Sequence, residues 1–164
     1  MRAFPSAILV LASICGSACG GPTVDLTSGL RIADVSTGWL DAGRANGLNK
    51  LVPTVSFTLT NVSGAVLPLL QVNAVFRRAG QESEWGARFA TAADPKGLVA
   101  GASTRKLTLS SDLGYTGADP RDEMLRNAQF VDVDVDLFCK YSATQWVRLG
   151  RYPVRRQLVA AVPQ

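Results

Sequence analysis

Residues 131–138 read VDVDVDLF, and this stretch decides the fold class. Aliphatic and acidic side chains alternate along it with a period of two, which predicts a β-strand with one buried face and one solvated face. The side chains expected to face the interior are Val131, Val133, Val135 and Leu137. The strand therefore needs an apolar partner layer on one side only.

The segment that follows predicts the second strand of a hairpin. After a turn at 142–144, Val147 and Leu149 alternate with Trp146 and Arg148. A single register buries the apolar side chains of both segments, so the pairing is strongly specified. We expect Trp146 and Arg148 to point outward.

The same alternation recurs in earlier parts of the chain. It predicts strands near 30–35, 55–60, 70–76, 85–89 and 107–110, with inward-facing Trp85, Ala87 and Phe89 in the fourth of these. Polar and glycine-containing loops are expected between them, including one at 41–49. Asp119 and Pro120 predict the start of a short helix, with Asp119 as its N-cap. About seven short strands and one helix predict a mainly β antiparallel sandwich over residues 29–164.

The N-terminus predicts export. Arg2 precedes an apolar stretch at 7–14 that is too short to span a bilayer, and the small residues of 16–18 lead to Cys19. This junction resembles the lipobox of bacterial lipoproteins, which implies that residues 1–18 are a signal peptide. The resemblance also implies that Cys19 carries a lipid that anchors the protein to a membrane. Ordinary secretion, with Cys19 left as a free thiol, is the alternative.

The residues after Cys19 indicate where the anchored chain would go. The stretch 19–28 is small, polar and glycine-containing, which is typical of a flexible linker. The residue after the cysteine is Gly20, and by the same resemblance the absence of aspartate there implies an outer-membrane lipoprotein that faces the periplasm. Nucleic acid is not an expected partner of an exported protein.

The composition argues against common catalytic chemistry. The chain has 164 residues, a formal net charge of +4 and no histidine. Histidine is the usual general base near neutral pH and the commonest metal ligand. The sequence also lacks a nucleophile elbow, a phosphate-binding glycine loop and paired metal-binding cysteines. We therefore expect no enzyme activity, no cofactor and no metal.

The aspartates Asp132, Asp134 and Asp136 form the most conspicuous polar series. An EF-hand calcium loop would need glycine and glutamate where this chain has Leu137 and Ala143. We interpret the series as a solvated strand face that pairs with arginines such as Arg148. A glycan site that combines these aspartates with Trp146 or Trp85 is one alternative hypothesis. A hydrolase that uses Asp132 and Asp134 is another.

The remaining candidates are interpreted structurally. Cys139 continues the inward-facing series and is expected to be buried. Trp39 and Trp85 are expected in or near the core. The arginines at 148–156 are expected on a solvated terminal strand, with contact to an anionic surface as the alternative. Asn61-Val62-Ser63 matches a glycosylation sequon, which we discount in a chain with a bacterial type of signal.

Two stretches, VSFTLTNVSG at 55–64 and LQVNAVF at 70–76, carry a resemblance to a known family, together with Gly101-Ala102-Ser103 ahead of a later strand. They resemble bacterial immunoglobulin-like accessory domains of the FxLYD type. The resemblance implies an immunoglobulin-like sandwich without catalytic residues. Together with the N-terminus, it predicts a non-enzymatic cell-envelope lipoprotein that acts as a binding or structural accessory module for an envelope protein or a glycan.

Overall fold

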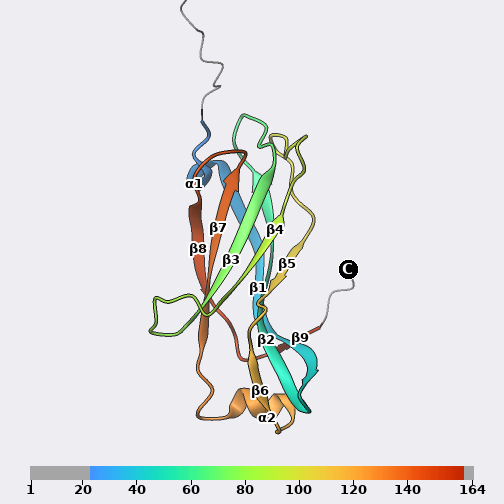
Figure 1. Cartoon of the computed structure of the whole chain (residues 1–164). Coiled ribbons are helices and arrows are strands. Elements are labelled where there is room, and N and C mark those ends of the chain that lie inside the picture. The colour runs from blue at the N-terminus through green and yellow to red at the C-terminus, as the bar shows by residue number, and fades with distance from the viewer. Residues whose placement is uncertain (1–22, 161–164) are drawn as a thin grey trace, which may run out of the picture.

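The computed structural model describes residues 23–160 and shows two β-sheets packed face to face (Figure 1). One sheet has the strand order β5-β2-β1-β9, with β6 also paired to β2, and the other has the order β4-β3-β7-β8. The strands are β1 (Leu30–Ala45), β2 (Leu48–Asn61), β3 (Leu70–Arg78), β4 (Gly86–Thr91), β5 (Leu107–Ser110), β6 (Tyr115–Gly117), β7 (Val133–Tyr141), β8 (Val147–Pro153) and β9 (Leu158–Val159). The helices are α1 (Leu26–Gly29) and α2 (Arg121–Arg126).

The chain crosses four times between the two sheets of this β-sandwich. The chain changes sheet after β2, returns after β4, and changes again on the way to β7. All pairings are antiparallel except the short one between β1 and β9. The predicted fold class is confirmed. The two strands beyond the predicted seven are β6 and β9, which have three and two residues and are too short to show a periodic pattern.

The β7–β8 hairpin follows the predicted alternation. Val135, Leu137 and Cys139 are fully buried, while Trp146 and Arg148 are exposed, as expected. Val131 contradicts its prediction, because it lies before β7 begins and is 41% exposed. The alternating sequence pattern begins at residue 131, two residues before β7 begins.

The region predicted as a loop at 41–49 belongs instead to a long hairpin. β1 and β2 are paired as far as Ala45 and Leu48, and only Asn46 and Gly47 form the turn. Both turn residues have positive φ, 51° and 81°, as a two-residue type I′ turn requires. The loop prediction was wrong because it relied on the glycine, asparagine and alanine content of the whole segment, whereas only the Asn-Gly pair forms the turn.

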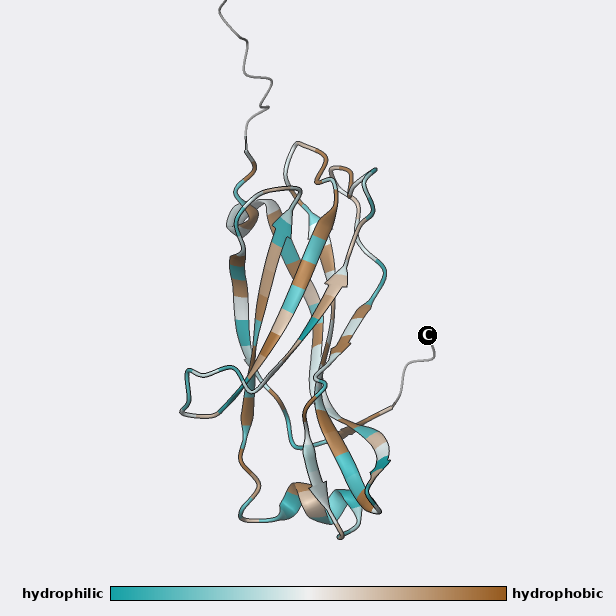
Figure 2. Cartoon of the chain, in the orientation of Figure 1, coloured by the Kyte–Doolittle hydropathy of each residue, from teal (hydrophilic) through white to brown (hydrophobic). Residues whose placement is uncertain are grey.

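The core between the sheets is built from the alternating apolar positions. Trp39, Phe57, Phe76 and Leu137 have no exposed surface, and Figure 2 shows hydrophobic and hydrophilic residues alternating along the strands. Ala87 is an exception to its prediction, because it pairs with Val75 on the outward side of β3. Phe89 is a second exception, since it is 51% exposed. It pairs with Asn73 on the outward side of β3, so Ala90 and not Phe89 packs against the core.

The helices and the start of the domain also differ in detail from expectation. The predicted helix exists as α2, with Met124 buried, but Pro120 occupies the N-cap and Asp119 does not cap it. At the other end, Leu26 in α1 is 2% exposed. Leu26 packs in the apolar core, although it lies within the stretch 19–28 that was expected to be a linker. Neither helix of the described region is long and apolar enough to cross a membrane.

Candidate functional site

The outward side of the four-stranded sheet gathers most of the predicted site residues. We call this surface the outer face. Its members on the strands alternate with the core residues of the same strands, and Trp146 lies immediately before β8. They are Gln71, Asn73, Val75, Arg77, Ala87, Phe89, Thr91, Asp134, Asp136, Phe138, Lys140, Trp146, Arg148 and Arg151. Asp132 is not among them, because it precedes β7 and pairs with Arg156, whose Nε lies 2.6 Å from its Oδ1.

Asp136 organises the charged part of the outer face. Arg151 donates two hydrogen bonds to its carboxylate, at 2.9 and 3.0 Å, and Arg77 donates one at 2.9 Å. The Nη1 of Arg148 lies 3.5 Å from the Oδ1 of Asp136, so the predicted pairing of an aspartate with Arg148 is confirmed. However, Asp136 is only 2% exposed and is not the solvated residue that the alternation predicted.

The arginines also fix the charge state of Asp136. Hydrogen bonds from Arg151 are the largest cause that lowers its pKa, burial opposes them, and Arg77 and Arg148 lower the pKa further. The carboxylate is therefore held ionised and accepts hydrogen bonds on both oxygens. A group in this state is a structural anion and is poorly suited to act as a general acid.

The other part of the outer face is aromatic and open. The Trp146 and Phe89 rings lie 6.2 Å apart at an interplanar angle of 84°, and these residues are 40% and 51% exposed. The Lys140 ammonium sits 5.1 Å from the centre of the Trp146 ring. Gln71 and Asn73 lie on β3, where Asn73 pairs with Phe89 and Gln71 pairs with Lys140. Their side-chain amides make no hydrogen bond to another residue of 23–160. These groups are free to contact a ligand.

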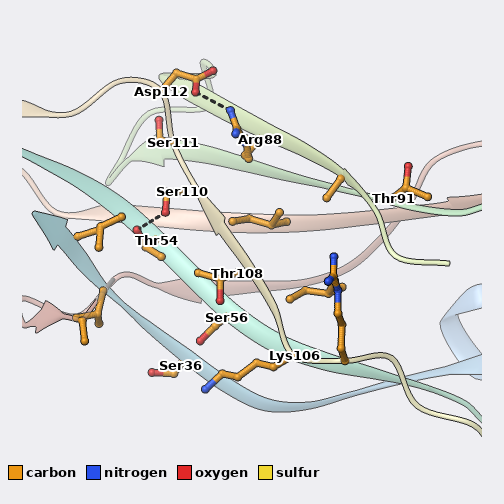
Figure 3. Close-up of a pocket in the computed structure, with 17 residues that line it drawn as sticks. Ser36, Thr54, Ser56, Arg88, Thr91, Lys106, Thr108, Ser110, Ser111 and Asp112 are labelled. Carbon is orange, nitrogen blue, oxygen red and sulfur yellow. Dashed lines mark hydrogen bonds and ion pairs between the residues drawn. The ribbon is translucent and has the colours of Figure 1, made fainter. Parts of the chain in front are cut away.

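A second candidate surface lies on the outward side of the other sheet and continues to the edge strands β4 and β5. It is an open groove of about 860 Å³ whose floor carries hydroxyl groups (Figure 3). The register places Ser36, Ser56 and Thr108 side by side on three strands. Lys106 lies at one end of the groove and Arg88 at the other, where its Nη1 is 3.0 Å from Asp112.

Sequence reasoning missed this groove. The local pattern shows only that the outward residues at 54–60 and 106–110 are serine, threonine and lysine. Their alignment across strands depends on pairings between residues about 20 and 50 positions apart in the sequence.

The remaining predicted residues have structural environments. Cys139 is fully buried, as expected, and burial raises the pKa of its thiol to about 12. Trp39 lies in an aromatic cluster with Trp85, confirming their predicted place in or beside the core. Asn61 has no exposed surface and bonds Ala65 and Leu98, so the sequon residue is inaccessible in the folded domain.

The arginine series has a mixed outcome. Arg156 donates to the carbonyl of Phe130 at 2.8 Å and pairs with Asp132, so it ties the chain before β7 to the segment after β8. Arg148 and Arg151 belong to the outer face, as described. Within residues 23–160, no group of three cysteine, aspartate or glutamate side chains is placed to hold a metal ion.

Comparison with known proteins yields little beyond these observations. No family model and no curated protein matches the sequence. One similar solved structure is described as the X-ray structure of Northeast Structural Genomics Consortium target SoR45. It is 12% identical, has a TM-score of 0.45, and the match covers 79% of this chain and 89% of that one. Cys19, the predicted lipidation site, and the signal peptide lie outside the described residues.

Proposed function

We propose that this protein is a non-enzymatic binding module of the cell envelope, and that the outer face of its four-stranded sheet is the binding surface. The observation that carries the proposal is the exposed contact between Trp146 and Phe89. Large aromatic side chains left in solvent on an otherwise polar surface are typical of interaction sites, and tryptophan is enriched among the residues that dominate binding energy.

The charged cluster supports the proposal by making the surface rigid. Asp136 holds arginines from β3 and β8 against the middle strand β7. A ligand that settles on such a surface loses little side-chain freedom from the protein, which favours affinity. Lys140 lies against the Trp146 ring and Arg148 lies beside Asp136 on the same face, and both cations favour ligands with negative or polar groups.

Membrane attachment through Cys19 is part of the same proposal. It is supported by the apolar stretch at 7–14 and by the small residues immediately before Cys19. Multiple acyl chains would hold the module stably at a membrane, whereas a single chain would not. An outer-membrane position facing the periplasm is supported by the resemblance to bacterial lipoproteins, since Gly20 and not aspartate follows the cysteine.

A glycan is the second, more specific form of the ligand. Sugar rings stack on aromatic side chains while amides and cations bind their hydroxyl groups, and the outer face offers both kinds of group. The specific observation is that Asn73, with an unbonded amide, pairs with Phe89, and that Gln71, with another, pairs with Lys140, which lies against the Trp146 ring. An envelope protein would instead bury the side chains of Trp146 and Phe89 in a protein–protein interface.

Both proposed ligands, an envelope protein and a glycan, can be tested by comparing binding to the mature protein with binding to a Trp146→Ala variant. Affinity chromatography of envelope proteins and a glycan array would identify the ligand. We expect the variant to lose about 2 kcal/mol of binding free energy, or about thirtyfold in affinity. Leu113→Ala is the matched control, because Leu113 is 52% exposed but lies off the outer face. Equal affinity for wild type and Trp146→Ala would reject the outer face, and turnover of an envelope substrate would reject the non-enzymatic role.

A further inference from the structure

Three valines are exposed at the end of the sandwich where the described chain begins. Val62, Val66 and Val99 are 42%, 47% and 53% exposed. They lie on the loops that follow β2 and β4, and Figure 1 shows both loops at the end occupied by α1. Leu67 and Leu98 form a β-bridge, which places Val66 and Val99 opposite each other. We call these three valines the apolar tip.

The backbone of the apolar tip is fixed by hydrogen bonds. Leu67 and Leu98 exchange two backbone hydrogen bonds of 3.0 Å each. The backbone amide of Asn61 donates to the Ala102 carbonyl at 2.9 Å. The buried Asn61 side chain donates to the carbonyls of Ala65 and Leu98 at 2.8 and 2.7 Å. The valines are therefore held in solvent by a well-bonded frame, at a cost that burial against a partner would remove.

The chain enters the domain directly beside this tip. The Val62 amide donates to the Gly29 carbonyl at 2.9 Å, and the Val24 amide donates to the Tyr141 hydroxyl at 2.7 Å. Only four residues separate Cys19 from Val24. A fully extended chain covers about 3.6 Å per residue, so Val24 lies within about 18 Å of a lipid-bearing Cys19.

We propose that the apolar tip rests on the membrane surface, so that the sandwich stands end-on with the tip at the lipid and the Asn46-Gly47 turn and α2 at the opposite end. This inference rests on the proposed lipidation of Cys19. The occupant is the lipid surface because the short tether keeps the tip within reach of it. Aliphatic side chains on a rigid frame partition into the interface between headgroups and acyl chains. In this orientation the outer face is turned sideways, where a ligand can reach it.

The inference can be tested with the lipidated, full-length mature protein in vesicles of phosphatidylethanolamine and phosphatidylglycerol. Val99→Cys carries an environment-sensitive fluorophore, and spin-labelled lipids quench it on contact. Cys139 is buried and does not compete for the label. Leu48→Cys is the matched control, because Leu48 is an exposed aliphatic residue, 38% exposed, beside the turn at the opposite end.

We expect a blue shift and strong quenching at position 99 and neither effect at position 48. Mass spectrometry of the Cys19 peptide separates the two proposals: a lipidated protein whose position 99 stays unquenched overturns the tip contact alone, and an unmodified Cys19 overturns both. Equal quenching at both positions means that the domain lies flat and overturns the end-on orientation. A blue shift without vesicles, accompanied by dimerisation, makes a second copy the occupant and also overturns the proposal.

Discussion

Asp136→Asn is the substitution that tests the outer face most directly. The carboxylate accepts three hydrogen bonds of 2.9–3.0 Å from Arg77 and Arg151. An asparagine keeps one acceptor oxygen, and its amide nitrogen turns a donor toward at least one guanidinium donor. Hydrogen bonds to a charged group are about twice as strong as neutral ones, so each bond loses about 1 kcal/mol.

The total free energy lost from these three hydrogen bonds has to be reduced, because the arginines are partly solvated. Arg77, Arg151 and Arg148 are 19%, 35% and 55% exposed, and water can replace part of what they lose. We therefore expect a loss of about 2–3 kcal/mol in the free energy of unfolding at pH 7. With a urea dependence of about 2 kcal/mol per molar, the unfolding midpoint falls by about 1–1.5 M. Tryptophan fluorescence reports the transition, since Trp39 is buried.

Asp134→Asn is the matched control. Asp134 lies two residues away on the same strand and forms no ion pair with another residue of the described chain. Its replacement is expected to change the free energy of unfolding by less than about 0.5 kcal/mol. Equal effects of the two substitutions, or no effect of Asp136→Asn, would refute the account of the arginine cluster.

The pH dependence gives a second readout of the same carboxylate. Its folded-state pKa is lowered, mainly by the hydrogen bonds from Arg151. Its contribution is therefore fully present above the unfolded-state pKa of about 4 and is lost as pH falls through the lower folded-state value. The stability difference between wild type and Asp136→Asn should be constant from neutral pH to about pH 5 and shrink below about pH 4. A difference that grows on acidification would contradict this assignment.

Three further predictions concern the scaffold. Gly47→Ala places a side chain in open space at a residue with φ 81°, so backbone strain alone should lower the free energy of unfolding by about 1–2 kcal/mol. Thermal unfolding measures the change, and an unchanged melting temperature would argue against the type I′ turn. Asn61→Ala leaves the carbonyls of Ala65 and Leu98 without their donor and should cost about 2–4 kcal/mol in urea unfolding, while a neutral result would mean that water replaces the amide. Cys139, with its pKa raised to about 12, should react with a thiol reagent at pH 8 only as fast as the domain unfolds, and rapid reaction of the native protein would disprove its burial.

The sequence predicted those strands whose two faces differ in chemistry. Val55, Phe57 and Leu59 alternate with hydroxyl side chains, and all three are fully buried. Burial of alternate positions is a local property of an extended chain, so a single segment contains the information. The same holds for the β7–β8 hairpin, where outward Trp146 was expected and found.

The failures arise where the environment of a residue comes from distant strands. Asp136 has the local pattern of a solvated residue, but one of its arginines comes from β3, 59 positions away. In β4, the period-two series of Trp85, Ala87 and Phe89 predicted that Phe89 faces inward, but the register places Arg88 on that side of the strand. Arg88 in fact escapes at the edge of the sheet, where it is 51% exposed and pairs with Asp112. The candidate surfaces were therefore only partly predictable, since each is assembled by strand register.

The long β1–β2 hairpin has a consequence for the order in which the domain folds. Its turn is only two residues, so pairing can start beside Asn46 and Gly47 and spread outward along 16 and 14 residues. Hairpins of this kind form in about 1–10 μs, whereas β-sandwiches as a class fold in milliseconds to seconds. The pairing of β3 with β7 must close a chain segment of more than 50 residues. We therefore expect the hairpin to serve as an early template on which the second sheet is assembled, with recruitment of β7 as the slow step.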